Sequence, residues 1–171
     1  MIGELFHLGL EARCLDAIKV DLAAKPGDPV ALAYRGALVA MSAGKAAGLG
    51  KKTRLVTEAY LDLDAAVAAS ARAEDHLAVL VCRGNVSSAV PNDVFGRAAQ
   101  GAADFDAAAG IVAASKDPVF AGNCLAQAAA AYEKAGLPED AGSRWATLAA
   151  TKGLGSAIRL QLLDRGFQTE D

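Results

Sequence analysis

The sequence predicts an all-α protein, a right-handed α-solenoid of about three stacked helical hairpins with an N-terminal and a C-terminal capping helix. Three observations support this fold class. Alanine, the best helix former, occupies 41 of the 171 positions. Aromatic residues make up only 5% of the chain, whereas strands favour aromatic and β-branched side chains. No segment alternates apolar and polar residues over the length of a strand.

An N-terminal helix is expected over about residues 3–24. Apolar residues recur there at steps of three and four, which places them on one face of a helix: Leu5, Leu8, Ala12, Leu15, Ile18 and Leu22. Pro26-Gly27 should end this helix, because proline cannot continue a helix and glycine favours a turn.

The first hairpin is expected over about residues 28–71. Asp28 is suited to cap its first helix, and Pro29 would occupy the first helical position, where its missing N–H costs nothing. Three glycines after residue 43 interrupt the pattern: Gly44, Gly48 and Gly50. The second helix of the hairpin should therefore run over about residues 53–71.

Two more hairpins are expected over about residues 75–114 and 117–153, followed by an end helix over about 156–165. Asp75 can cap the first helix of the second hairpin, which stops near Pro91, and Asn92 or Asp93 opens its second helix. In the third hairpin Gly136 separates the two helices, and Gly153 closes it.

Two short echoes support a repeat architecture. Asp28-Pro29-Val30 recurs as Asp117-Pro118-Val119, and each copy opens a helix. Tyr34-Arg35-Gly36 is echoed by Cys82-Arg83-Gly84 at a similar depth in a helix. A hairpin leaves one face unburied, so stacking on its neighbours is the way to bury it.

Residues 125–148 resemble a tetratricopeptide repeat. The matching residues are Leu125, Ala128, Ala129, Tyr132, Gly136, Ala141, Trp145 and Leu148. The match covers one repeat well, and the chain departs from the family at Gly153 and at Pro91, where the family has proline and an aromatic residue. The whole chain is similar to a divergent tetratricopeptide-like superhelix, which implies a scaffold that binds a protein or peptide.

In that family the first helix of each hairpin lines a concave groove. The resemblance therefore implies that the groove residues are Tyr34, Met41, Lys45, Asn85, Asn123, Glu133 and Lys134. Asparagine side chains at such positions could hydrogen-bond an extended peptide. The alternative is that all seven are ordinary solvated helix residues.

The charge balance excludes some partners. Lys+Arg number 17 and Asp+Glu 20, so the chain lacks the basic surface that nucleic-acid binding requires. The longest uncharged run, 118–132, is too short and too weakly apolar for a membrane span. The start lacks a secretory signal pattern, and three well-separated cysteines suggest reduced thiols, so we expect a cytoplasmic protein without a membrane partner.

The segment from Gly44 to Thr53 superficially resembles a phosphate-binding loop, but its glycines are one residue too far apart and a helix precedes it. We interpret it as a flexible cationic turn. Lys45, Lys51, Lys52 and Arg54 would gather positive charge before a helix N-terminus and suit an acidic partner.

No motif indicates catalysis or a cofactor. Glu4, His7 and Glu11 share one helix face, but di-iron bundles need a second such motif, which is absent, so a surface histidine is the better interpretation. Cys14, Cys82 and Cys124 lie in Ala-rich helices and are interpreted as small core residues. Neither histidine has a Ser or Cys partner in its sequence context for nucleophilic catalysis.

Two arginines each precede a glycine within a helix. We hypothesise that Arg35 pairs with Asp62 or Asp64, and that Arg83 pairs with Asp104 or Asp106, because a guanidinium can satisfy several acceptors at once. Simple exposure of both arginines is the alternative.

The sequence thus predicts a non-catalytic scaffold without a cofactor that binds a protein or peptide in a helical groove. A structural subunit of a homo-oligomer is the second hypothesis. An all-α metal-binding protein or enzyme that uses His7 and nearby acids is the third.

Overall fold

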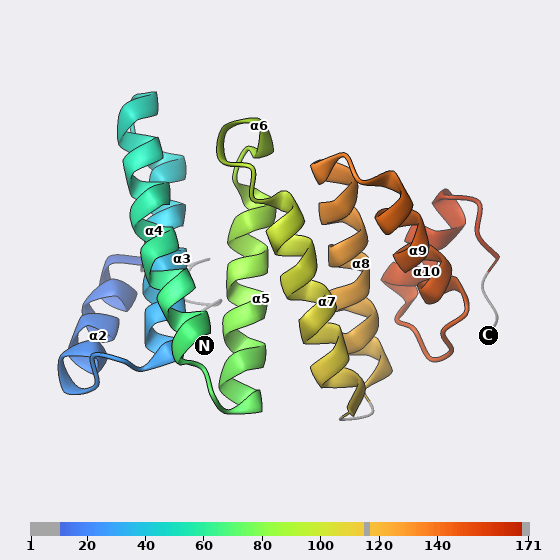
Figure 1. The fold of residues 1–171 in the computed structure, drawn as a ribbon, viewed down its shortest axis with the longest axis horizontal. Helices are drawn as coiled ribbons and strands as arrows, with labels where there is room; N and C mark the ends of the chain where they lie inside the picture. The colour runs from blue at the N-terminus through green and yellow to red at the C-terminus, as the bar shows by residue number, and fades with distance from the viewer. Residues whose placement is uncertain (1–10, 115–116, 169–171) are drawn as a thin grey trace. The chain divides into compact units, whose positions relative to one another are not determined.

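The computed structural model describes residues 11–114 and 117–168. Every regular element in these two ranges is a helix, so the predicted all-α class is confirmed for the described part of the chain (Figure 1). The chain divides into two compact units, Met1–Arg83 and Gly84–Asp171, and each has its own buried core. The boundary falls inside α5 (Ala73–Ala89), the first helix of the expected second hairpin.

The first unit contains α2 (Glu11–Ala24), α3 (Pro29–Lys45), α4 (Leu49–Ala69) and the first part of α5. Asp28 caps α3 as predicted, since its carboxylate accepts a hydrogen bond from the Ala31 N–H at 2.9 Å, and Pro29 is the first helical residue. The three-residue turn after α3 returns the chain antiparallel along it, and α2 packs on the other side of α3 (Figure 1).

The α3–α4 contact depends on Gly36. A Cβ atom added to Gly36 would lie 2.7 Å from the Ala59 carbonyl oxygen and 2.8 Å from Leu63 Cγ, closer than real atoms approach. Ala59 and Leu63 are themselves fully buried. The two helix backbones therefore approach closely at Gly36, as expected of helices rich in small residues.

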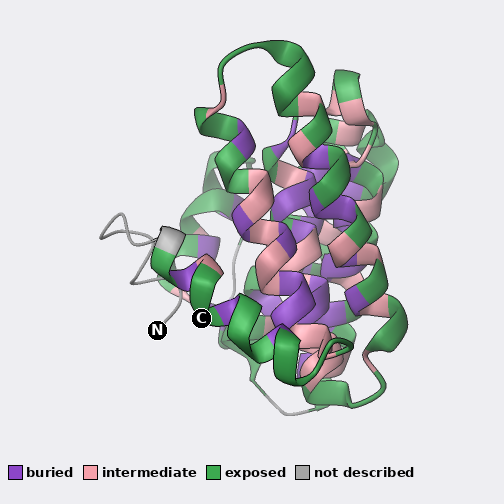
Figure 2. Ribbon diagram, turned by 90° about the vertical axis from the view of Figure 1, so that its left-hand side faces the viewer, coloured by how far each residue is buried: buried purple, intermediate pink, exposed green. Residues whose placement is uncertain are grey.

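The first unit buries one stripe from each of its helices and leaves the outer faces to solvent, which Figure 2 shows as purple and green. The buried residues of α2 are Cys14, Ile18 and Leu22. Ile18 and Leu22 belong to the predicted apolar face, whereas Cys14 was not part of it and the predicted Leu15 is half-buried. α5 adds two contacts within this unit. The Cys82 thiol lies 3.3 Å from the Ala33 carbonyl oxygen, and Arg83 binds Asp64 of α4.

The second unit contains the rest of α5 and five further helices: α6 (Asn92–Phe95), α7 (Ala98–Ala114), α8 (Pro118–Ala135), α9 (Pro138–Ala149) and α10 (Ser156–Asp164). α8 packs against both α7 and α9, and α10 packs against α8 and α9. Asp117 caps α8 as predicted by accepting a hydrogen bond from the Phe120 N–H at 2.9 Å. Gly136 ends α8 with a φ of 75°, as its position after the helix predicted.

The expected helix from Asn92 to about Ala114 is broken in two. Gly96 takes a left-handed conformation with φ of 62° and ends the short α6. The Asn92 side chain then accepts a hydrogen bond from the Ala98 N–H at 2.9 Å, where α7 begins. The prediction of one helix was therefore wrong, because the Asn92 side chain caps a second helix that begins six residues later, at Ala98.

The expected long turn between α3 and α4 is also shorter than predicted. α4 begins at Leu49 and not near Thr53, since only Gly48 takes a positive φ, of 82°, while Gly44 and Gly50 lie in helices. Lys45, Lys51 and Lys52 are therefore helical, and the flexible-turn interpretation was wrong for them, whereas Arg54 is helical as expected.

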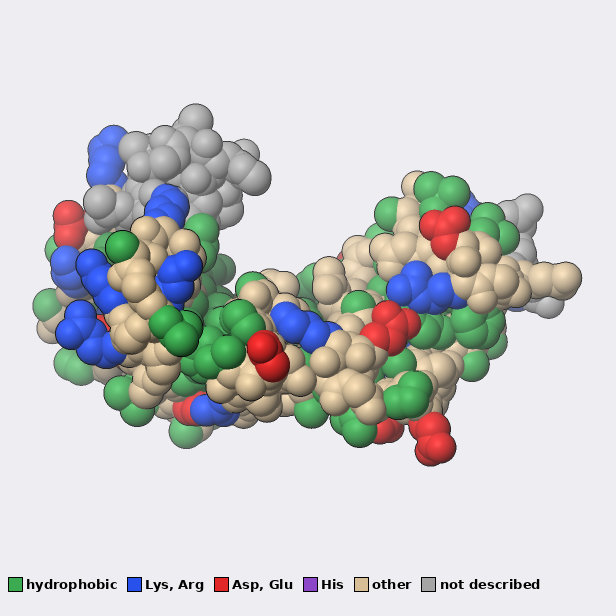
Figure 3. All heavy atoms as spheres, turned by 90° about the horizontal axis from the view of Figure 1, so that it is seen from above, with side chains coloured by type: hydrophobic (Ala, Val, Ile, Leu, Met, Phe, Trp, Pro, Cys, Tyr) green, Lys and Arg blue, Asp and Glu red, His purple; other side chains and the backbone are tan. Residues whose placement is uncertain are grey.

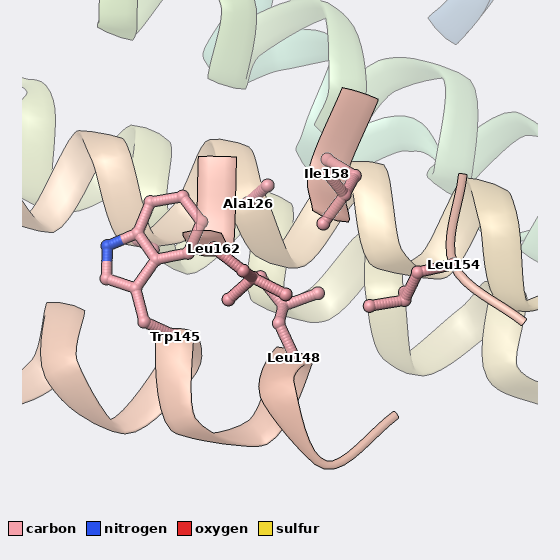
Figure 4. Close-up of a cluster of buried hydrophobic side chains, with 7 residues drawn as sticks. Ala126, Trp145, Leu148, Leu154, Ile158 and Leu162 are labelled. Carbon is pink, nitrogen blue, oxygen red and sulfur yellow. The ribbon is translucent and has the colours of Figure 1, made fainter. Parts of the chain in front are cut away.

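One hydrophobic cluster joins α8, α9 and α10. Trp145 and Leu148 project from α9 towards Ile158 and Leu162 of α10, with Leu154 beside them (Figure 4). Ala126 and Ala129 of α8 complete the cluster. Two further small residues matched to the repeat family are buried outside this cluster, with exposed fractions of 0% for Ala128 and 2% for Ala141.

Candidate binding surfaces

In the first unit, the predicted groove residues lie on one face of α3. Tyr34, Met41 and Lys45 are spaced by seven and four residues, which places them on a common helix face. Tyr34 is half-buried, whereas Met41 and Lys45 are exposed. α3 therefore presents a short exposed row that ends in a cation at the last turn of the helix.

In the second unit, the amide side chains are exposed. Asn85 lies on the later part of α5 and Asn123 on α8. Sequence reasoning missed Gln127, which is also exposed and follows Asn123 by one helical turn. The exposed row of α8 continues through Ala130 to Lys134 at helical spacing, and this spacing was the signal that could have identified Gln127.

Glu133 and Lys134, the remaining predicted groove residues, bind other parts of the second unit. Lys134 Nζ donates to the carbonyl oxygens of Ser88 at 2.6 Å and Val90 at 2.8 Å, and so satisfies acceptors at the end of α5. Glu133 accepts a hydrogen bond from the Trp145 indole N–H at 2.8 Å. Both side chains therefore fix local structure while remaining partly accessible.

Glu133 and Trp145 belong to a polar contact that secures the end of α10. The Arg165 guanidinium lies over the Trp145 ring, 4.0 Å from its centroid, and Arg165 Nη2 is 3.4 Å from Glu133 Oε2. A cation over an indole face is attracted by the ring quadrupole. These contacts connect α8, α9 and the residue that follows α10.

A second polar cluster, which sequence reasoning missed, connects α7, α8 and α9. The Tyr132 hydroxyl donates to Asp106 Oδ2 at 3.0 Å, and Arg144 Nη2 donates to the same oxygen at 2.6 Å. Burial, reinforced by the hydrogen bond to Asp106, raises the pKa of Tyr132. The hydrogen bond to Asp106 also raises the pKa of Arg144. Each of these three side chains therefore has a hydrogen-bond partner on another helix, which is typical of a structural contact.

The predicted pairing of Arg35 is confirmed. Arg35 Nε donates to Asp62 Oδ2 at 2.7 Å, and Arg35 Nη2 donates to the other carboxylate oxygen, so the contact is bidentate. The side chain of Arg35 is 37% exposed and that of Asp62 is 13% exposed. The hydrogen bond to Asp62 raises the pKa of Arg35.

Arg83 also pairs with a carboxylate, and this partner lies on the preceding helix, α4. Arg83 Nη1 donates to Asp64 Oδ1 at 2.8 Å, and only 12% of the Arg83 side chain is exposed. Asp64 was one of the two partners predicted for Arg35. The predicted pairing of Arg83 with Asp104 or Asp106 would join the two units and stays a prediction.

The basic residues near the α3–α4 turn form one exposed group. Lys45 lies in the last turn of α3, and Lys51, Lys52 and Arg54 lie in the first two turns of α4. Figure 3 looks onto this end of the first unit and shows blue Lys and Arg side chains gathered there. We call Lys45, Lys51, Lys52 and Arg54 the basic end.

His76 has a serine neighbour that the sequence context did not reveal. Ser70 Oγ lies 2.7 Å from His76 Nδ1 and 2.9 Å from the Val67 carbonyl oxygen. The Ser70 hydroxyl donates to the Val67 carbonyl, and the donor of the Ser70–His76 hydrogen bond depends on the histidine tautomer. The pair therefore joins the end of α4 to α5 across the turn between them.

The cysteines behave as core residues. Cys14 and Cys124 are buried and Cys82 is half-buried, and all three are free thiols. Burial raises the pKa of Cys82 from 9.0 to about 12 and raises the pKa of Cys124. Buried thiols with raised pKa values are poor nucleophiles at neutral pH, so the interpretation of these two as inert agrees with the structure.

Within residues 11–114 and 117–168, no three His, Cys, Asp or Glu side chains converge to hold a metal ion. Glu4 and His7 of the candidate metal motif lie outside those residues, and the side chain of Glu11 is not described. Among the described residues, no helix combines the length and apolar character needed to cross a lipid bilayer.

Comparison with known proteins yields no relative. No protein-family model matches the chain, and neither does any curated protein or solved structure. The function is therefore argued from the surfaces described above.

Proposed function

We propose that the chain is a non-catalytic scaffold that binds a protein or peptide along the exposed faces of α3, α5 and α8. In this proposal the hairpins stack as a right-handed solenoid similar to tetratricopeptide repeats, and these three helices line its groove. The residues that contact the ligand are Tyr34, Met41, Lys45, Asn85, Asn123, Gln127, Glu133 and Lys134.

The observation that carries the proposal is the pair of exposed amides on α8. Asn123 and Gln127 lie one helical turn apart and have no hydrogen-bond partner among the described residues. Each side-chain amide carries donors and an acceptor, as does a peptide group. Their separation along the helix is about 6 Å, close to the roughly 6.6 Å between alternate residues of an extended strand. The two amides therefore suit the repeat of an extended peptide backbone.

The proposal is tested by comparing the proteins that co-purify from the native cell with the wild type and with the double variant Asn123→Ala/Gln127→Ala. The matched control is Gln161→Ala, which removes an exposed amide from α10. At least one partner should be retained by the wild type and the control and lost by the double variant. Retention of every partner by the double variant would contradict the proposal.

A second candidate function is self-association through α10. Leu160 and Leu163 lie three residues apart on the outer face of this helix and are 63% and 55% exposed. An end helix of a repeat array normally presents a polar outer face, so these leucines favour a covering partner, here a second copy. Light scattering tests this candidate, and a monodisperse monomer at high concentration would exclude it.

A further inference from the structure

Three residues of the basic end lie in the first two turns of α4. Lys51, Lys52 and Arg54 are exposed, form no ion pair with another described residue, and span about 4.5 Å along the axis of α4. The first turn of α4 contains no acidic residue, and Gly48 provides no side chain to cap it. The basic end therefore presents four cations over ten residues around one turn.

These cations lie at the end of the helix where they are least favourable. The N-terminus of a helix carries partial positive charge, so acidic side chains stabilise it and basic ones destabilise it. Other helices have acids at this end. Asp117 is the N-cap of α8, and Glu139 and Asp140 lie in the first turn of α9. At the start of α4, the positive end of the helix dipole therefore lies beside positively charged side chains. An anionic partner would reduce the repulsion between them.

Two exposed apolar side chains adjoin the basic end. Leu49 is 70% exposed and Met41 is 42% exposed. Leu49 precedes the buried Val56 by seven residues and Leu63 by fourteen, so it continues the core-facing stripe of α4 to the start of the helix. Methionine adapts readily to different apolar partners. The surface therefore offers apolar contacts as well as positive charge.

We propose that this surface binds an acidic segment of another protein that also carries apolar side chains. The chain as a whole has a net charge of −3, so the residues outside the basic end carry −7. A membrane or a nucleic-acid duplex is an extended anionic surface and would meet that negative charge as well. A short acidic segment meets only the basic end, because charges beyond roughly 8 Å are screened at physiological salt. This surface shares Met41 and Lys45 with the proposed groove. It adds Leu49, Lys51, Lys52 and Arg54 and does not include the exposed amides of α8, so the inference goes beyond the proposed function.

Fluorescence anisotropy with a fluorescein-labelled peptide of glutamates interspersed with leucines tests the proposal. The variant is K51E/K52E/R54E, in which the helix dipole favours each new side chain, so the substitutions do not unfold α4. The matched control is K19E/K25E/R72E, which reverses three other exposed cations of the first unit and gives the same net charge. Because net charge is equal, a difference between the two variants reports the position of the charge.

The wild type and the control should bind the peptide with similar affinity, and the affinity should fall as salt increases. K51E/K52E/R54E should bind the acidic peptide at least about tenfold more weakly than the wild type. This variant should instead bind a peptide of lysines and leucines. Absence of saturable binding by the wild type would overturn the proposal, as would equal loss in both variants. Binding to phosphatidylserine vesicles without binding to the acidic peptide would also overturn it.

Discussion

Arg35 and Asp62 are the best-defined charged pair of the first unit. The guanidinium donates two parallel hydrogen bonds from α3 to the carboxylate on α4. Removing the arginine would leave Asp62, which is only 13% exposed, without its cation.

Arg35→Ala should lower the free energy of unfolding by about 1–2 kcal/mol, a value that allows for the partial exposure of Arg35. Urea denaturation measures this change. The control is Lys19→Ala, since the Lys19–Asp16 pair is exposed and should contribute less than about 0.5 kcal/mol. Equal, small effects of both substitutions would show that the Arg35 pair does not stabilise the fold.

The raised pKa of Cys82 should make stability depend on alkaline pH. The pKa is about 12 in the folded protein and near 9.0 when the thiol is exposed, so the unfolded chain loses this proton first. The free energy of unfolding should therefore be unaffected by Cys82 below pH 9 and should fall as the pH rises from 9 towards 12, by at most about 1.4 kcal/mol per pH unit.

Urea denaturation at several pH values between 8 and 11 checks this dependence. Cys82→Ala removes the titrating group, so its stability should decline less steeply than that of the wild type over the same range. Parallel declines would exclude a contribution from Cys82. The comparison with the variant is needed because Cys124 and Tyr132, whose pKa values are also raised, act in the same direction.

At the scale of single residues, local signals were predictable, whereas most distant contacts were not. Asp28 and Asp117 act as caps because the partner N–H lies three residues away, within the reach of a sequence pattern. Tyr132 and Arg144 meet Asp106 across 26 and 38 residues, and nothing local in the sequence marks such a contact. Arg35 was paired correctly because a helical hairpin has an approximate register.

The α3–α4 hairpin provides the first test at the scale of elements. Gly36→Ala would place a methyl group 2.7 Å from the backbone of α4, which cannot move aside as a flexible side chain can. We expect a loss of about 1–3 kcal/mol in the free energy of unfolding. Gly44→Ala is the control in the same helix, since nothing lies within 4 Å of its added Cβ, and it should stabilise by about 0.5–1 kcal/mol. A neutral Gly36→Ala, measured by thermal or urea unfolding, would refute the close approach.

The docking of α10 provides a second test. Leu162 is fully buried in the cluster with Trp145 and Leu148, whereas Leu160 is 63% exposed on the same helix. Leu162→Ala should cost about 2–5 kcal/mol, and Leu160→Ala should change stability by less than about 0.5 kcal/mol. Similar values for the two variants would mean that α10 does not pack as described. Denaturant titration of both proteins provides the comparison.

At the scale of elements, the existence of most helices was predictable and two boundaries were not. Periodicity and caps identified α3, α8 and α9 because their signals agree. Gly44, Gly48 and Gly50 look alike in the sequence, yet only Gly48 leaves the helical conformation. The break at Gly96 was missed because Asn92 looks like a helix start, while its side chain caps Ala98.

At the scale of the whole molecule, α5 is one continuous helix that contributes to both units. Its first part supplies Cys82 and Arg83 to contacts in the first unit, and its last part supplies Gly84 and Ser87 to contacts with α7. Unfolding of either unit therefore removes support from the same helix. The prediction of three stacked hairpins did not include this shared role. The repeated Arg-Gly pair suggested that α5 has the same role in its hairpin as α3 has in the first one.

We therefore expect the two units to unfold in one cooperative transition. The chain has a single tryptophan, Trp145, which lies in the second unit. Its fluorescence should change at the same urea concentration as the far-ultraviolet circular dichroism of the whole chain. Gly36→Ala, a substitution in the first unit, should shift both transitions together. A fluorescence midpoint that Gly36→Ala leaves unmoved would show that the units unfold independently.

The three cysteines lie on three different helices, α2, α5 and α8. Alkylation requires an accessible thiolate, so each thiol becomes reactive only when its own surroundings open. A brief pulse of maleimide followed by mass spectrometry of the peptide fragments would therefore record local opening at three places in one sample. The three thiols thus act as built-in reporters of local unfolding, and one of them, Cys82, lies on the helix that contributes to both units.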